Sequence, residues 1–190
     1  MLQFEIAPDF SMTPTAQVEA VLKGGCRWII APSSLQPAEI EGIIEECKAV
    51  DAFLTIKNDV DLTDRLRVHG VVLSDCSVDH AAAVREKLGP HAVIGFTAHS
   101  AAEILALRGK DIDYAVIPSV GTDTSVEQAI AIASEANAAG NNVHLVAQGD
   151  MKLTDIPALL KGGFNGIATT GLIICSPDPT ARVEEILKLA

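Results

Sequence analysis

The stretch HAVIGFTAHSAAEILALRGKDIDYAVIPSVGTDTS, residues 91–125, decides the fold. It contains two short apolar runs, Ala92–Phe96 and Tyr114–Ile117, and small or polar residues follow each run directly. Short runs without polar alternation predict strands that are buried on both faces, as in a parallel sheet. Between them, Ala101–Gly109 mixes leucine and isoleucine with Ala, Glu and Arg and stops at a glycine, which predicts a helix. The predicted unit is therefore strand, helix, strand.

The rest of the chain repeats this unit. The predicted strands are Leu2–Ala7, Arg27–Ala31, Ala52–Ile56, Val71–Leu73, Ala92–Phe96, Tyr114–Ile117, Val143–Ala147 and Gly166–Ala168. A helix is expected after each strand, the first opening at Thr13-Pro14 and the last covering Asp178–Leu189.

Alternating strands and helices require right-handed crossovers, and eight such units most economically close into a ring. We therefore expect an α/β protein with one (β/α)8 TIM-barrel domain over residues 1–190 and short loops. The rival is an open doubly wound sheet, which would normally carry a glycine fingerprint after the first strand. Pro8-Asp9-Phe10 stands there instead.

Composition excludes several classes of function. The 190 residues are 48% hydrophobic and 21% charged, which is typical of one compact domain. A net charge of -11 and an aromatic content of 4% argue against binding to nucleic acids or anionic membranes. No run reaches the roughly 18 apolar residues of a membrane span, and the amino terminus does not resemble a signal peptide. We expect a cytoplasmic protein.

The four cysteines, Cys26, Cys47, Cys76 and Cys175, show no C-x-x-C spacing. Cys26 and Cys175 lie in or beside apolar runs, where a free thiol usually acts as a small hydrophobic group. We interpret the cysteines as reduced and structural, without a metal.

In a barrel the carboxyl ends of the strands meet at one mouth, so the residues that follow each strand are the candidates for chemistry. They are Asp9, Ser33, Ser34, Lys57, Asn58, Asp59, Ser74, Asp75, Ser77, Thr97, His99, Ser119, Thr122, Thr124, Gln148, Gly149, Thr170 and Gly171. Hydroxyl groups and glycines dominate this set.

The loops after the seventh and eighth strands suit a phosphate group. Glycines at Gly149 and Gly171 let the backbone approach a ligand, and a following helical turn points free N–H groups at it. The alternative is that both are ordinary turn glycines, and the carboxylate of Asp150 beside them would repel an anion.

His99 lies just past a strand end and has the side chain expected of a general acid/base. The alternative, favoured by spacing alone, is a histidine that braces the loop. Lys57 would neutralise a phosphate or carboxylate, or is a solvated loop lysine. Asn58, Asp59 and Asp75 are oxygen ligands that suit Mg²⁺, although Asp59 or Asp61 is expected to cap the next helix instead.

Several motifs together resemble the thiamine phosphate synthase family and its TenI relatives, the thiazole tautomerases. They are Ile94–Ser100, Asp113-Tyr114, Thr122-Asp123-Thr124 and Phe164–Ile167. The resemblance covers roughly residues 52–175 in order. It implies a TIM barrel that takes part in thiamine biosynthesis and binds a phosphorylated small molecule.

Two activities follow from the resemblance. The synthase is a transferase that uses Mg²⁺ to join a pyrimidine diphosphate to a thiazole phosphate and releases diphosphate. The tautomerase is an isomerase that needs no metal, and the histidine matching His99 moves its proton. The resemblance also places a set of residues at the thiazole phosphate: Thr122, Thr124, Gly149, Thr170 and Gly171. Lys57 is the second candidate catalytic residue, while Asn58 and Thr97 are further candidates for substrate binding.

The chain departs from the family where positive charge is expected. Ile30, Pro32 and Ser34 stand where basic and amide side chains follow the second strand, Ser77 replaces a metal-binding aspartate, and Ser125 replaces a lysine. A diphosphate leaving group needs its developing charge stabilised, so these losses argue for weak or altered synthase chemistry.

Two classes of function remain. The first is an enzyme or former enzyme of thiamine biosynthesis that binds a thiazole phosphate or thiamine phosphate, with the tautomerase as the rival activity. The second is a catalytically silent barrel that binds a phosphorylated metabolite or a partner protein. A homo-oligomer is compatible with either.

Overall fold

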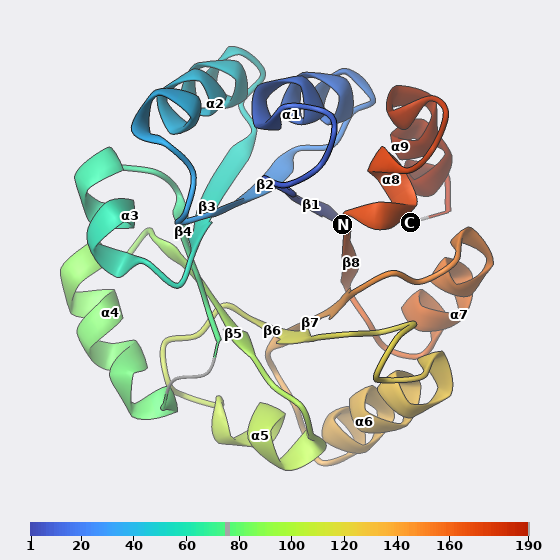
Figure 1. Cartoon of the computed structure of the whole chain (residues 1–190). Helices are drawn as coiled ribbons and strands as arrows, with labels where there is room; N and C mark the ends of the chain where they lie inside the picture. The colour runs from blue at the N-terminus through green and yellow to red at the C-terminus, as the bar shows by residue number, and fades with distance from the viewer. Residues whose placement is uncertain (75–76, 190) are drawn as a thin grey trace.

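Eight parallel strands close into a barrel in the order β1 to β8 in the computed structural model, which describes residues 1–74 and 77–189 (Figure 1). The strands are β1 Leu2–Glu5, β2 Trp28–Pro32, β3 Phe53–Lys57, β4 Gly70–Leu73, β5 Val93–Thr97, β6 Tyr114–Ile117, β7 His144–Gln148 and β8 Gly166–Thr169. Closure comes from pairing of β8 with β1, where Gln3 lies opposite Ala168. The predicted TIM barrel is confirmed.

The helices form a ring around the barrel (Figure 1). They are α1 Pro14–Lys23, α2 Pro37–Ala49, α3 Val60–Leu66, α4 Ala81–Leu88, α5 Ala101–Ala106, α6 Val126–Ala138, α7 Ile156–Lys161, α8 Gly171–Ile174 and α9 Pro179–Leu187. Short 3₁₀ turns, η1 Val78–His80 and η2 Leu153–Asp155, precede α4 and α7. The short helix α8 was not predicted; it separates β8 from the expected last helix.

Local side-chain caps explain where several helices begin. Thr13 accepts a hydrogen bond from the N–H of Ala16, and Pro14 occupies the first turn of α1, as the sequence predicts. Ser125 and Gln128 form a reciprocal capping box at the start of α6. These caps end each loop soon after its strand, which keeps the loops short.

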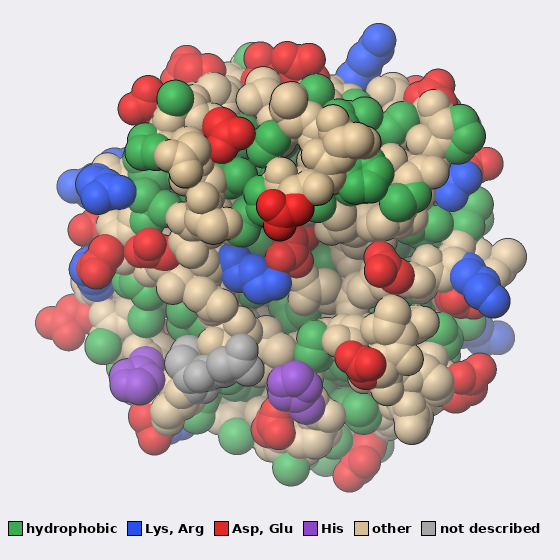
Figure 2. Space-filling view, viewed as in Figure 1, with side chains coloured by type: hydrophobic (Ala, Val, Ile, Leu, Met, Phe, Trp, Pro, Cys, Tyr) green, Lys and Arg blue, Asp and Glu red, His purple; other side chains and the backbone are tan. Residues whose placement is uncertain are grey.

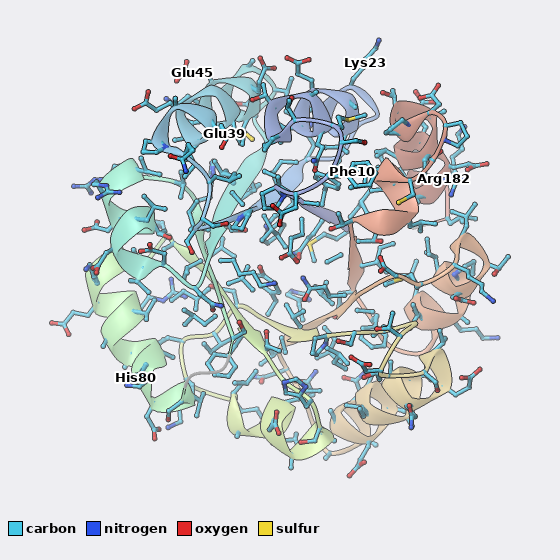
Figure 3. All side chains as sticks on the ribbon, in the orientation of Figure 1. Phe10, Lys23, Glu39, Glu45, His80 and Arg182 are labelled. Carbon is cyan, nitrogen blue, oxygen red and sulfur yellow. The ribbon has the colours of Figure 1, made fainter. Side chains whose placement is uncertain are left out.

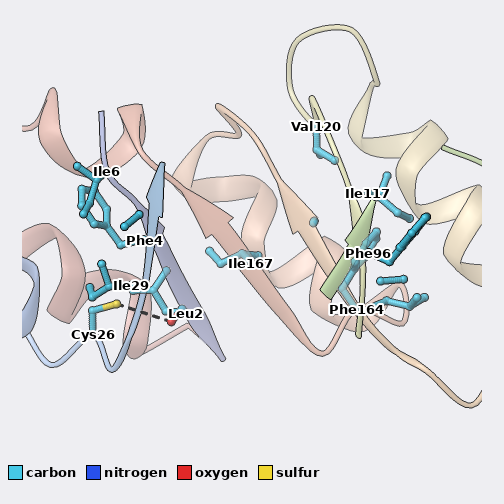
Figure 4. Close-up of a cluster of buried hydrophobic side chains, with 14 of the residues drawn as sticks. Leu2, Phe4, Ile6, Cys26, Ile29, Phe96, Ile117, Val120, Phe164 and Ile167 are labelled. Carbon is cyan, nitrogen blue, oxygen red and sulfur yellow. Dashed lines mark hydrogen bonds between the residues drawn. The ribbon is translucent and has the colours of Figure 1, made fainter. Parts of the chain in front are cut away.

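The main hydrophobic core lies between the barrel and the helices. Outward-facing side chains such as Phe4, Ile29 and Ile167 are fully buried there. Figure 4 shows part of this layer, including the contact in which the thiol of Cys26 donates to the backbone oxygen of Leu2 at 3.7 Å. Burial on this scale, rather than helix propensity, holds the short helices against the strands.

The inside of the barrel is filled by stacked layers of four side chains from alternate strands, as in other TIM barrels. Strand register defines an apolar layer just below the mouth: Ile30, Val72, Val116 and Ala168. Deeper still, the ring of Tyr114 lies across Gly95, where an added Cβ would be 2.3 Å from the Tyr114 ring. Trp28 packs edge-on against Tyr114 with ring centroids 5.3 Å apart. The interior is therefore filled by side chains, and the barrel is not an open channel.

The cysteines differ from one another in exposure. Cys26 and Cys47 are buried free thiols, which agrees with a structural role. Cys175 is exposed, so it does not act as a small hydrophobic group of the core; it caps the C-terminus of α8, whose last residue, Ile174, is buried. Cys76 lies outside the described residues. Within residues 1–74 and 77–189, no helix has both the length and the apolar character needed to cross a bilayer.

Candidate functional site at the barrel mouth

The uppermost layer inside the barrel is polar, in contrast to the layer beneath it. Strand register brings its four members, one from each odd-numbered strand, to the same level: Glu5, Lys57, Thr97 and Gln148. We call these four residues the mouth layer. Each is the last residue of its strand, which is where TIM barrels place functional side chains.

Glu5 is the centre of the mouth layer. One carboxylate oxygen lies 2.7 Å from the Lys57 ammonium, and the other accepts a hydrogen bond from the Gln148 amide. The Thr170 hydroxyl donates to the backbone oxygen of Glu5 at 2.6 Å. Figure 2 shows basic and acidic atoms lying against one another near the middle of this end of the molecule. Glu5 therefore links β1 to β3, β7 and the loop after β8.

The sequence predicted Lys57 as a site residue but not Glu5. The side chains are partly shielded, with 33% of Lys57 and 21% of Glu5 exposed. A charged pair held by a further amide is more ordered than a solvated surface pair, so the alternative of a freely solvated loop lysine does not hold. The predicted catalytic role of Lys57 stays a prediction.

Asn58 turns its side chain to the neighbouring strand end. Its backbone has a positive φ of 58°, a conformation that asparagine tolerates better than most residues. The side-chain oxygen accepts a hydrogen bond from the N–H of Ser74 at 2.7 Å, and the amide nitrogen donates to the Ser74 hydroxyl at 2.7 Å. Asn58 therefore ties the loop after β3 to the end of β4.

The predicted metal ligands do not come together among the described residues. Asp59 caps α3, accepting a hydrogen bond from the N–H of Leu62 at 2.8 Å, so the alternative capping role is confirmed. The hydroxyl of Ser77 caps η1. Asp75 lies outside the described residues. Over the part of the chain that the structure describes, no three His, Cys, Asp or Glu side chains are grouped so as to hold a metal ion.

Gly149 allows two loops to touch. Its φ is 155°, and an added Cβ would lie 2.2 Å from the backbone oxygen of Val120. The N–H of Gly149 donates to the oxygen of Ala168 at 3.0 Å. This contact accounts for the glycine without a ligand, as the turn alternative expected, and the phosphate role of Gly149 stays a prediction.

A carboxylate stands beside the other glycine of the predicted phosphate site. An added Cβ at Gly171, the first residue of α8, would be 2.6 Å from a carboxylate oxygen of Asp150. Thr170, just before it, uses its hydroxyl to hold the backbone of Glu5. An anion approaching this turn would therefore meet negative charge.

The predicted threonines lie in the tight loop after β6. The Thr122 hydroxyl donates to the backbone oxygen of Ser119 at 3.0 Å, and the N–H of Thr124 donates to the same oxygen at 3.0 Å. Gly121 in this loop approaches the backbone of Asp150, where an added Cβ would lie 2.8 Å from the backbone oxygen. The loops after β6 and β7 thus form one packed rim.

His99 lies on the rim, outside the mouth layer. Its side chain is exposed and lines a groove of about 250 Å³ whose other walls include Val78, Phe96 and Leu107. Phe96 faces outward toward the helices, so this groove opens beside α5 rather than over the barrel axis. The backbone N–H of His99 donates to Glu103 at 2.8 Å. The predicted acid/base role of His99 stays a prediction.

Two other histidines, His80 (Figure 3) and His69, lie away from the mouth layer. Figure 3 shows side chains filling the centre of the ring and places His80 at the outer edge beside α4. His69 accepts a hydrogen bond from the N–H of Leu54 at 3.1 Å, before β4 begins. Neither is part of the mouth.

Comparison with known proteins gives consistent matches. A sequence model described as thiamine monophosphate synthase matches residues 6–173. A thiamine-phosphate synthase of Bacteroides fragilis is 33% identical over 184 residues, covering 88% of this chain and 89% of the relative. One from Bacteroides thetaiotaomicron is also 33% identical over 184 residues, covering 88% of this chain and 87% of that protein.

Among solved structures, a thiamine phosphate pyrophosphorylase from Pyrococcus furiosus superimposes with a TM-score of 0.80 at 21% identity, covering 99% of this chain and 94% of that one. This likeness supports the fold alone, whereas the sequence model, over residues 6–173, spans β2 to β8. The chain therefore belongs to the thiamine monophosphate synthase family and is a barrel of thiamine biosynthesis.

Proposed function

We propose that the mouth binds a thiazole phosphate or thiamine phosphate and that synthase chemistry at this mouth is weak or altered. Family membership supports the class of ligand. The proposal of weak or altered synthase chemistry rests on the ion pair between Glu5 and Lys57. This pair neutralises the lysine of the mouth layer before any ligand binds.

In a synthase reaction of the expected kind, the thiazole nitrogen bonds to the methylene carbon of the pyrimidine as the bond from that carbon to diphosphate breaks, so negative charge grows on the leaving group. Pro32, Ser34 and Ser125 carry no charge at positions where the family resemblance expects donors, and Lys57 is already paired. Removing a single donor to a developing anion costs about 10²–10³ in rate. We therefore expect turnover at least about 10²-fold below that of a fully equipped synthase.

The part of the chain that remains suited to ligand binding is the mouth layer with its adjoining loops. Lys57 and Gln148 supply hydrogen-bond donors, Thr97 supplies a hydroxyl, and the apolar layer beneath offers a floor for a heterocyclic ring. Mg²⁺ would supply charge for the diphosphate in a synthase, and its effect is part of the test below.

The experiment is calorimetric titration of the chain with thiamine phosphate and thiazole phosphate, followed by a diphosphate-release assay with and without Mg²⁺. The Bacteroides fragilis thiamine-phosphate synthase is the matched control. We expect measurable binding together with slow release. Absence of binding to both compounds would refute the proposed ligand, and release as fast as in the control would refute the altered chemistry.

We also propose one domain located in the cytoplasm, which the biosynthetic family supports. Light scattering in solution distinguishes a monomer from a homo-oligomer.

A further inference from the structure

We propose that Glu5 is a specificity-determining residue that lowers the affinity of the mouth for the phosphate group of its ligand. This inference rests on the proposed function, because it concerns the same mouth and the same class of ligand. As a consequence, the ring of the ligand contributes more to its affinity for the wild-type chain than the phosphate group does.

The first step of the argument is the competition for Lys57. Its ammonium is 2.7 Å from a Glu5 oxygen, and both side chains are partly shielded from water. A phosphate oxygen that reaches Lys57 must share it with this carboxylate or displace it. Like charges at such short range repel each other, and partial burial weakens the screening by solvent.

The second step is that Glu5 is held in place. Its other carboxylate oxygen accepts from the Gln148 amide, and its backbone oxygen accepts from the Thr170 hydroxyl at 2.6 Å. Moving the carboxylate away from Lys57 would also break the bond to Gln148. The pair is thus part of a network, unlike an isolated surface pair that opens at little cost.

A second carboxylate, on the other side of the predicted phosphate site, would also repel a phosphate group. Asp150 lies beside Gly171 at the start of α8. The two carboxylates come from different loops, and both stand at positions where a phosphate would need positive charge or free N–H groups. The mouth therefore has donors for a heterocycle and little net attraction for an anion.

The test compares a phosphate ester with the same molecule lacking phosphate. Thiazole phosphate and the corresponding thiazole alcohol are titrated into the wild-type chain, Glu5→Gln and Asp51→Asn. Gln keeps the shape of Glu5 and one acceptor oxygen, while its amide nitrogen replaces the other oxygen and the charge is lost. Asp51 is an exposed residue before β3, at the end of the barrel opposite the mouth, and its replacement removes the same charge without touching the mouth layer.

We expect Glu5→Gln to raise the affinity for thiazole phosphate about fivefold, the scale of a partly shielded ion pair. Affinity for the alcohol should change by less than about twofold, and Asp51→Asn should change neither affinity by more than that. An unchanged or lower affinity of Glu5→Gln for the phosphate ester would overturn the proposal, and so would an equal gain in Asp51→Asn, which would show an effect of net charge alone.

A double-mutant cycle with Lys57→Gln tests whether Glu5 acts through the lysine. The lysine change should cost more phosphate-ester affinity in the Glu5→Gln background than in the wild type; equal costs in the two backgrounds would contradict the mechanism. Urea unfolding of each variant checks that the barrel is intact.

Inorganic phosphate separates failure of this inference from failure of the proposed function. If no variant binds either thiazole compound, the proposed ligand is wrong. Phosphate should still raise the melting temperature of Glu5→Gln more than that of the wild type, and equal shifts would refute the role of Glu5.

Discussion

Gly149 shows how a single residue sets the shape of the rim. Its backbone passes so close to Val120 that a methyl group has no room, and its φ of 155° is one that side chains rarely adopt. The same glycine predicted a phosphate loop in the sequence. Glycine is ambiguous in this respect, because a close approach of ligand and a close approach of protein backbone impose the same requirement.

We predict that Gly149→Ala destabilises the chain by roughly 2–4 kcal/mol, because the two loops must separate to accept the methyl group. Gly109→Ala is the matched control: its φ is 68°, and an added Cβ there meets nothing within 4 Å. That variant should lose only about 1 kcal/mol. Urea unfolding of both variants measures the difference, and equal losses would show that the contact with Val120 does not matter.

Asp150 is the second residue whose removal should be informative. We predict that Asp150→Asn strengthens binding of thiazole phosphate by a few-fold, because it removes the carboxylate beside Gly171 while keeping its size. Titration calorimetry measures the change, with Asp51→Asn, an exposed substitution before β3 at the other end of the barrel, as the control. A loss of affinity would mean that Asp150 helps to hold the ligand.

At the scale of elements, helix caps compete with metal binding for the same side chains. Asp59 satisfies the first turn of α3 through the N–H of Leu62. Nearby Asp61 pairs with Lys87, which lowers the pKa of the Asp61 carboxyl. A carboxylate that follows a strand and precedes a helix is in position for either role, so sequence alone leaves both open.

We predict that Asp59→Ala costs about 1 kcal/mol of stability, whereas Asp59→Asn costs only a few tenths because asparagine also caps helices well. Urea unfolding checks this pair. Repeating the ligand titration with Asp59→Asn in the presence and absence of Mg²⁺ separates the roles: a Mg²⁺-dependent affinity that this change removes would assign Asp59 to a metal after all.

Most elements were predictable because most strands are built around a short apolar run and most helices have a start or stop signal; the short helix α8 was the exception. The role of Glu5 was not predictable in the same way. The first strand was expected to cover Leu2–Ala7, which places Glu5 inside the strand and makes Asp9 the candidate residue after it. The usable signal was the alternation of Gln3 and Glu5 with apolar neighbours: in a barrel whose outer face is covered by helices, polar members of a strand face the interior. Its contact with Lys57 joins residues 52 apart in sequence, which no local pattern specifies.

At the scale of the whole molecule, two buried thiols make stability depend on pH. Burial raises the pKa of Cys26 to about 11 and that of Cys47 to about 12, from 9.0 for an ordinary thiol. Both pKa values are higher in the folded chain than in the unfolded chain. Their contribution is therefore fully present below pH 9 and is lost as pH rises through the folded values, because only the unfolded chain releases these protons readily.

We predict that the free energy of unfolding falls between pH 9 and pH 11, by about 1 kcal/mol for each thiol at pH 10. Urea unfolding at pH 8, 9 and 10 measures the fall. The variant Cys26→Ala/Cys47→Ala should be less stable at pH 8 but show a flatter profile. A profile as steep as that of the wild type would assign the pH dependence to other groups.

The plug formed by Trp28 and Tyr114 has a practical consequence for spectroscopy. These are the chain's single tryptophan and single tyrosine, and they lie below the apolar layer, at the end of the barrel opposite the mouth. Intrinsic emission should report melting of the barrel faithfully while remaining silent when a small molecule docks at the far end. A quench or blue shift on titration would therefore signal a rearrangement transmitted along the strands.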